Sequence, residues 1–172
     1  PLYSSAASDV YKRQTHVCDS CMYAKQTRGP FPSTGHKAAK PLNLVHMDVC
    51  GPMPEPSIGG SRYVATILDD CSGLSAAAFT DSKAAVTDKV IHILTELQRS
   101  TGHQVQEVRT DRGGEYVNQR LTRWFISNGI RHGTTVGYMP EQNGAAERLN
   151  RTLLEKTRAM LIEARLPKSL WA

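Results

Sequence analysis

The sequence has no long apolar run, no signal peptide and few cysteines, and each absence argues against a class of protein. A membrane-spanning helix needs roughly 20 consecutive apolar residues, and the runs here are far shorter, so we expect no membrane span. The four cysteines lack the dense spacing of a disulfide framework. With the missing signal peptide, this favours an intracellular, reducing location.

What the chain does contain is the composition of a globular domain with a basic excess. Of its 172 residues, 40% are apolar and 22% are charged, which suits one principal folded core. The formal charge of +5 and an isoelectric point near 9.2 fit a polyanionic partner, although basic residues also serve solubility alone. There is no starting methionine and an apolar pattern still runs at Trp171, so we interpret the chain as a fragment.

Three regions differ in their patterns. Residues 1–14 show no helical or strand periodicity, and we interpret them as an artefact of read assembly or as a disordered natural leader. Residues 15–40 contain two cysteines followed by a Lys, Arg, Gly and Pro-rich stretch, which predicts a small knuckle and a linker. Residues 41–172 form the predicted main domain, truncated at its carboxyl end.

Periodicity within the main domain predicts an α/β fold. Alternation and β-prone runs predict three initial strands forming an antiparallel meander, then a helix capped by Ser82 and ended by Gly102. Another strand, a second helix, a short strand and a long helix follow. The predicted strands span 44–49, 62–68, 74–80, 104–110 and 130–134, and the long helix spans 143–164. This order is typical of a mixed five-stranded sheet flanked by helices.

Three acidic residues occupy positions that suit metal chemistry. Asp48 lies near the end of the first strand, Asp111 just beyond the fourth, and Glu147 in the first turns of the long helix. Side chains at adjacent strand ends point into one crevice, and a helix start can add a third group. Hard cations such as Mg²⁺ bind oxygen ligands, and two-metal phosphoryl transfer needs several carboxylates. Taken singly, each acid is more often a solvated cap.

The segments around these acids resemble the integrases of copia-type long-terminal-repeat retrotransposons. The most specific features are the 35 residues between Asp111 and Glu147 and the segment QNGAAER. The matching stretches are LVHMDVCGPM, GGSRYVATILDDCSG, VRTDRGGEY, GIRHGTTVGYMPEQNGAAERLNRTLLEKTRAML and LPKSLW. The resemblance implies a ribonuclease H-like fold and a catalytic triad of Asp48, Asp111 and Glu147 that binds Mg²⁺ or Mn²⁺.

The same resemblance implies what the protein acts on and where. The reaction is trimming of DNA 3′ ends and their transfer into a target duplex, so DNA is the partner and no covalent protein intermediate is needed. A homo-oligomer is expected for the full-length protein, and the nucleus is the expected site for a eukaryotic element. In the family the segment before and at the start of the long helix contacts DNA, which makes Gln142, Asn143 and Arg148 candidates here.

The long helix also has a pattern of its own. At 100° per residue, six small or apolar residues form a stripe expected to face the sheet, while Glu147, Arg151 and Arg158 lie on roughly the opposite side. The stripe consists of Ala146, Leu149, Leu153, Thr157, Met160 and Ala164. We predict that the two arginines bind DNA phosphates. The alternative is a solvated face on which they pair with neighbouring glutamates.

A pair of cysteines points to zinc. Cys18 and Cys21 resemble the second half of the HHCC zinc domain that precedes such cores, and two thiolates at this spacing suit tetrahedral Zn²⁺. A complete site needs two more ligands from further upstream, since His16 lies too close to Cys18. The alternative is two free thiols. Cys50 and Cys71 are expected to be buried or half-buried thiols of the sheet.

Departures from the family pattern keep two alternative functions open. Arg112 stands where the family usually has Asn, and this cation would either grip phosphate or weaken metal binding. One alternative is a related ribonuclease H-like nuclease or transposase. The other is a catalytically idle remnant that only binds nucleic acid.

Overall fold

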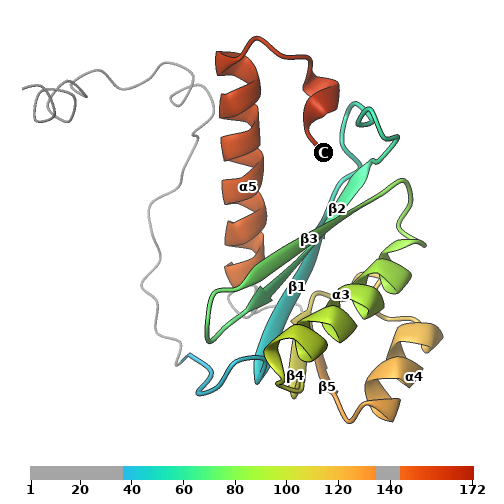
Figure 1. The fold of residues 1–172 in the computed structure, drawn as a ribbon. Coiled ribbons are helices and arrows are strands. Elements are labelled where there is room, and N and C mark those ends of the chain that lie inside the picture. Colours follow the sequence, from blue (N-terminus) through green and yellow to red (C-terminus); the bar gives the residue numbers. More distant parts are fainter. Residues whose placement is uncertain (1–36, 135–143) are drawn as a thin grey trace, which may run out of the picture.

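The computed structural model describes residues 37–134 and 144–172, which form one mixed sheet with helices on both sides (Figure 1). Each expected strand and helix is present, with ends within a few residues of those predicted. The elements are β1 (Leu44–Cys50), β2 (Tyr63–Asp69), β3 (Ser75–Thr80), α3 (Val86–Thr101), β4 (Glu107–Thr110), α4 (Gln119–Ser127), β5 (Arg131–Thr134), α5 (Gly144–Glu163) and the 3₁₀ turn η2 (Lys168–Leu170). Within the described ranges, none of the helices combines the length and apolar character that crossing a membrane requires.

The sheet has the strand order β3-β2-β1-β4-β5, so β1 lies at its centre. The first three strands form the expected antiparallel meander, with Asp48 of β1 opposite Thr66 of β2. β4 runs parallel to β1, and β5 runs parallel to β4. The carboxyl ends of β1 and β4 therefore lie at the same edge of the sheet, which is where Asp48 and Asp111 are found.

The main core lies on the side of the sheet covered by α3 and α4. Because side chains alternate along a strand, Val45 and Met47 of β1 enter this core while His46 and Asp48 face the α5 side. Core side chains come from the sheet, from α3 and α4 and from the connecting segments: Leu42, Val45, Met47, Ala65, Ile67, Val86, Val90, Leu94, Val105, Val108, Tyr116, Leu121, Phe125 and Ile130. This apolar layer holds β1 and β4 in place. The residues that alternate with the core positions, such as His46 and Asp48, therefore lie on the opposite face of the sheet.

The start of α3 differs from the prediction. The helix begins at Val86, and its N-cap is Ala85, which makes no side-chain capping bond. Ser82 lies in the preceding turn, where its carbonyl accepts a hydrogen bond from Thr80 Oγ1 at 3.0 Å. The predicted cap at Ser82 is wrong because this turn binds the end of β3 instead. The other end matches, since Gly102 caps α3 in the left-handed conformation at φ 69°.

The face of α5 that contacts the sheet also differs from the prediction. Leu153 and Met160, expected to face the sheet, are 38% and 63% exposed. The buried and half-buried residues that share one face are instead Ala146, Asn150, Leu154, Thr157 and Leu161. The stripe is rotated because Asn150, a polar residue, faces the sheet and binds a carboxylate there. Glu147, Arg151 and Arg158 are exposed, as expected.

Candidate active site

Asp48 is the most strongly fixed of the three predicted acids. It lies on β1, where its Oδ2 accepts a hydrogen bond from Asn150 Nδ2 of α5 at 2.8 Å. Its Oδ1 accepts from the Val49 backbone N–H at 3.0 Å, and Thr66 Oγ1 donates to its carbonyl at 3.4 Å. The carboxylate therefore has a set orientation on the face of the sheet that α5 covers.

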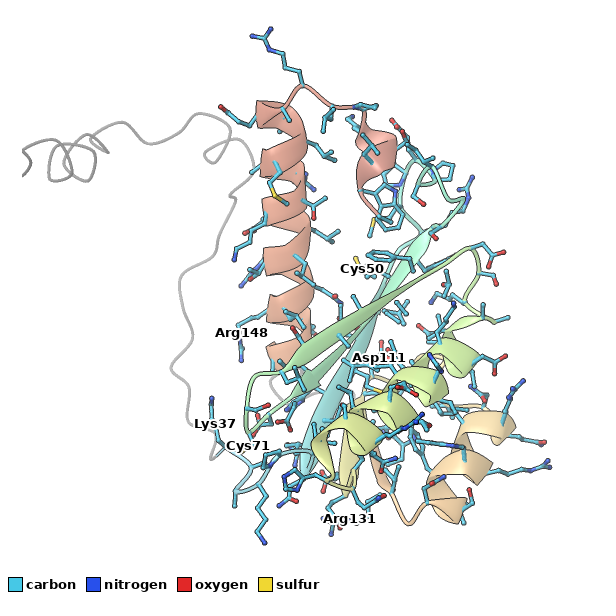
Figure 2. All side chains as sticks on the ribbon, in the orientation of Figure 1. Lys37, Cys50, Cys71, Asp111, Arg131 and Arg148 are labelled. Carbon is cyan, nitrogen blue, oxygen red and sulfur yellow. The ribbon has the colours of Figure 1, made fainter. Side chains whose placement is uncertain are left out.

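The two other acids approach Asp48 from neighbouring elements. Asp111 directly follows β4 and is exposed, with its Oδ1 accepting from the Gly113 backbone N–H at 2.9 Å (Figure 2). Glu147 is exposed in the first turn of α5. Burial raises the pKa of Asp48, and the negative charges of Asp111 and Glu147 raise it further. The three carboxylates therefore lie close enough for the charges of Asp111 and Glu147 to affect the ionisation of Asp48.

The three carboxylates are not gathered tightly around a single metal position. Across residues 37–134 and 144–172, no three His, Cys, Asp or Glu side chains lie close enough to form a metal site as they stand. The chemistry of the donors nevertheless fits a hard divalent cation, since all three groups supply carboxylate oxygens. A cation there would also relieve the repulsion that raises the pKa of Asp48.

Asn150 is a site residue that the sequence analysis missed. Its side chain is 5% exposed and donates to Asp48, while its Oδ1 has no hydrogen-bond partner among the described residues. A buried amide is favourable only when its polar atoms are bonded, so its place beside Asp48 points to the site. The available signal was its spacing, because Asn150 lies three residues after Glu147 and is therefore its neighbour on the surface of α5, on the side nearer the sheet.

The turn that carries Asp111 is anchored at several points. Glu115 forms an ion pair with Lys83 Nζ at 3.2 Å, and its backbone carbonyl accepts from Asn118 Nδ2 at 2.7 Å. Asn118 also caps α4 by accepting from the Leu121 backbone N–H at 2.9 Å. Tyr116 is fully buried in the core. These contacts, which were not predicted from the sequence, hold the turn that carries Asp111 at the end of β4.

The hydroxyl of Tyr116 is a second unpartnered polar group at this edge of the sheet. It is buried, and no described residue forms a hydrogen bond with it. Burial raises the pKa of Tyr116 well above its ordinary value, and the charges of Asp48, Asp111 and Glu115 raise it further. The phenol therefore stays protonated beside the carboxylates.

The remaining predicted residues fall into two groups. Arg112, Arg148, Arg151 and Arg158 are all exposed, and Arg148 projects from the first turns of α5 (Figure 2). Cys50 and Cys71 are half-buried free thiols, which confirms that prediction. The predicted zinc ligands Cys18 and Cys21 and the predicted DNA contacts Gln142 and Asn143 lie outside the described residues.

The amino-acid sequence is similar to one family model and to the Pol polyproteins of plant transposons. Residues 38–140 match the family model described as "Integrase core domain". The chain is 40% identical over 163 residues to the retrovirus-related Pol polyprotein from transposon TNT 1-94 of Nicotiana tabacum, covering 94% of this chain and 12% of that protein. It is 28% identical over 154 residues to the Pol polyprotein from transposon RE2 of Arabidopsis thaliana, covering 90% of this chain and 10% of that protein.

Solved structures show the same fold at low sequence identity. A chain of a simian T-cell lymphotropic virus intasome, in complex with the PP2A regulatory subunit B56 gamma, matches with a TM-score of 0.63 and 20% identity, covering 96% of this chain and 63% of that one. The HTLV-2 integrase catalytic core domain in complex with magnesium matches with a TM-score of 0.56 and 18% identity, covering 78% and 86%.

Proposed function

Because the chain belongs to the integrase core domain family, in its copia-type retrotransposon branch, we propose that it catalyses metal-dependent polynucleotidyl transfer on DNA. Its ribonuclease H-like sheet carries the acids that this chemistry needs. The single observation that carries the proposal is the placement of the acids: Asp48 on β1 and Asp111 directly after the parallel strand β4 lie at one edge of the sheet, and Glu147 is in the first turn of α5, which packs on β1. In agreement with this placement, burial raises the pKa of Asp48, its hydrogen bonds from Asn150 and Val49 oppose the rise, and the charges of Asp111 and Glu147 add to it.

In this proposal Asp48, Asp111 and Glu147 would hold Mg²⁺ or Mn²⁺, which would supply charge stabilisation for the attacking and leaving oxygens of a phosphodiester. Asn150 orients the carboxylate of Asp48, and the anchored turn 111–118 keeps Asp111 beside it. The attacking group is water during end trimming and a DNA 3′-hydroxyl during joining, so the protein itself supplies no nucleophile.

The proposal extends to partners. Arg148, Arg151 and Arg158 are exposed on the helix that begins at the site, and we propose that they contact DNA phosphates together with Gln142 and Asn143. The similar simian virus protein was solved in an intasome, which supports a multimer acting on DNA, in the nucleus for a eukaryotic element. A zinc site at Cys18 and Cys21, completed by upstream ligands, stays a prediction.

Metal-dependent joining of DNA tests the proposal. The 172-residue chain is incubated with a labelled model DNA end and a target duplex, in Mg²⁺ and in excess EDTA. We expect trimmed and joined products in Mg²⁺ and none in EDTA. DNA binding without products in Mg²⁺ or Mn²⁺ would support the alternative, a nucleic-acid-binding chain without catalysis. The open arrangement of the carboxylates is the observation that favours this alternative.

Replacing Asn150 by Ala is expected to weaken Mg²⁺ binding by about 10- to 100-fold, because the carboxylate of Asp48 loses the donor that orients it. Calorimetric titration with Mg²⁺ measures this directly and does not depend on activity. Thr152→Ala, an exposed change on the same helix, is the matched control and should bind Mg²⁺ as the unmodified chain does. Equal Mg²⁺ affinities for the two variants would show that Asn150 serves only packing.

A further inference from the structure

One face of the sheet is only partly covered by helix. On the side opposite the main core, α5 packs against β1 and β2. The β4 residues that face this side are Glu107 and Arg109, since Val108 between them lies in the core and Thr110 after them is also buried. From β5, Arg131 faces the same side because it is the register partner of Glu107. Glu107, Arg109 and Arg131 therefore form a charged strip of the sheet beside α5, which packs on β1 and β2 and not on this strip.

The charges of this strip form a small network around Glu107. Its Oε1 lies 3.0 Å from Arg109 Nε, and its Oε2 lies 3.3 Å from Arg131 Nη2. The Arg109 and Arg131 side chains are 39% and 78% exposed. Each guanidinium carries five N–H donors, so one carboxylate occupies only a few of them. The network keeps a net positive charge and has donors free to bind another anion.

The position of the two arginines relates them to the candidate active site. Arg109 lies two residues before Asp111, which is roughly 6.6 Å along an extended strand, so Arg109 is close to the candidate active site. Gly133 pairs with Arg109 and has no side chain that could cover it. On the same face, Arg109 is the register partner of His46, whose Nε2 lies 3.4 Å from Asp70 Oδ1. Burial lowers the pKa of His46, Asp70 opposes this, and the charges of Arg109 and Arg148 add to the lowering, so both arginines act on this face of the sheet.

The strip ends in a hollow at the opposite edge of the sheet from the carboxylates. This cavity has a volume of about 610 Å³, and Lys40, His103 and Arg131 are among the residues that line it. No acidic side chain is found among those lining residues. Figure 2 shows Arg131 at this end of the molecule, well away from Asp111. Positive side chains therefore extend from the site to this edge.

We propose that Arg109 and Arg131 form a track for the sugar-phosphate backbone of a DNA strand that leaves the carboxylates across β4 and β5. Guanidinium groups bind phosphate through paired charge-assisted hydrogen bonds, and they suit a backbone that is recognised without regard to sequence. Glu107 occupies both guanidiniums in the free protein and releases them to the phosphates. The inference rests on the proposed function, because it assumes that DNA reaches Asp48, Asp111 and Glu147.

DNA affinity measured at several salt concentrations tests the track. Fluorescence anisotropy of a labelled duplex with the full chain, in EDTA, separates binding from catalysis. Each phosphate contact contributes about 0.9 to the slope of log affinity against log salt, so Arg109→Gln with Arg131→Gln should lower the slope by roughly 2. The matched control is Arg99→Gln with Arg123→Gln, exposed residues of α3 and α4 on the other side of the sheet, and its slope should not change.

A single change at Glu107 gives an independent test with the opposite sign. Glu107→Gln removes the carboxylate that competes with phosphate, so DNA affinity should rise by about 3- to 10-fold at low salt. An ion pair that serves only to hold β4 to β5 would give no such rise. This variant keeps both arginines, so it remains informative even if the double variant folds poorly.

The outcomes separate this inference from the proposed function. If the unmodified chain binds DNA but the double variant keeps the full salt slope, or Glu107→Gln weakens binding, the track is wrong and the proposed function stands. If the unmodified chain binds no DNA at any salt concentration, the proposed function fails and the track fails with it.

Discussion

Glu147→Gln is expected to lower the rate of DNA joining by at least about a thousandfold, while the fold and DNA binding persist. Glutamine has nearly the shape of glutamate but no charge, so the change removes one anionic ligand and little else. Glu147 is exposed in the first turn of α5, and the described residues form no ion pair with it. Its replacement should therefore cost little stability, and the loss can be assigned to chemistry.

The control for this prediction lies two turns further along the same helix. Glu155→Gln makes the same chemical change at a position away from Asp48 and should leave the joining rate within about twofold. Rates are compared at saturating Mg²⁺, with DNA affinity measured in parallel. If Glu147→Gln retains a substantial fraction of the joining rate, Glu147 is not a metal ligand, and the assignment of the triad is wrong.

Asp69→Ala is expected to reduce the free energy of unfolding by about 3–5 kcal/mol, the largest stability effect we predict. Asp69 is 2% exposed, and its carboxylate accepts hydrogen bonds from the backbone N–H groups of Leu42 and Ser72, both at 2.9 Å. The Ser72 hydroxyl donates to it as well. Alanine would leave these donors unsatisfied at the point where the chain enters β1.

The contribution of Asp69 should also depend on pH. Burial alone would raise the pKa of Asp69, but the hydrogen bonds from Ser72 and Leu42 outweigh it and hold the pKa below its usual value. A group with a lowered folded pKa stabilises the native state above its ordinary pKa near 4 and loses that stabilisation as the pH falls through the folded value. Stability at neutral pH should therefore include this contribution in full.

Urea unfolding at neutral pH and at several pH values below 4 measures both effects. The unmodified chain should lose stability across the acidic range, and the Asp69→Ala variant should show a smaller part of that loss. Asp81→Asn, an exposed change in the turn before α3, serves as control and should unfold like the unmodified chain. A similar urea midpoint for Asp69→Ala and the unmodified chain would contradict the assigned hydrogen bonds.

The fold and the acids were predictable because their signals are local. Alternating apolar residues identify β1, and the positions of Asp48 and Asp111 relative to strand ends follow from counting along each strand. The partners that orient these acids were not predictable in this way. Asn150 is 102 positions from Asp48 and Lys83 is 32 from Glu115, so each contact exists only once segments distant in sequence have come together.

The rotation of α5 illustrates the same limit. The spacing of apolar residues predicted that Leu153 and Met160 face the sheet, but both are exposed. Hydrophobicity alone could not predict that the buried amide of Asn150 forms a hydrogen bond with Asp48. The polar contact sets the angle of the helix, and two apolar side chains are left exposed as a result. Sequence periodicity finds the helix, whereas its orientation depends on a specific long-range hydrogen bond.

The central position of β1 has a consequence for how the chain folds. β1, β2 and β3 are consecutive in sequence and pair across the connections 51–62 and 70–74, so closing these loops costs less entropy than a longer connection would. β4 must instead reach β1 across α3, and Leu44 pairs with Glu107, 63 positions later. Non-local pairings of this kind form slowly because the loop must close before any contact compensates for it. Asp48 and Asp111 therefore meet late in folding, so a nascent chain holds the first acid long before it can assemble a complete site.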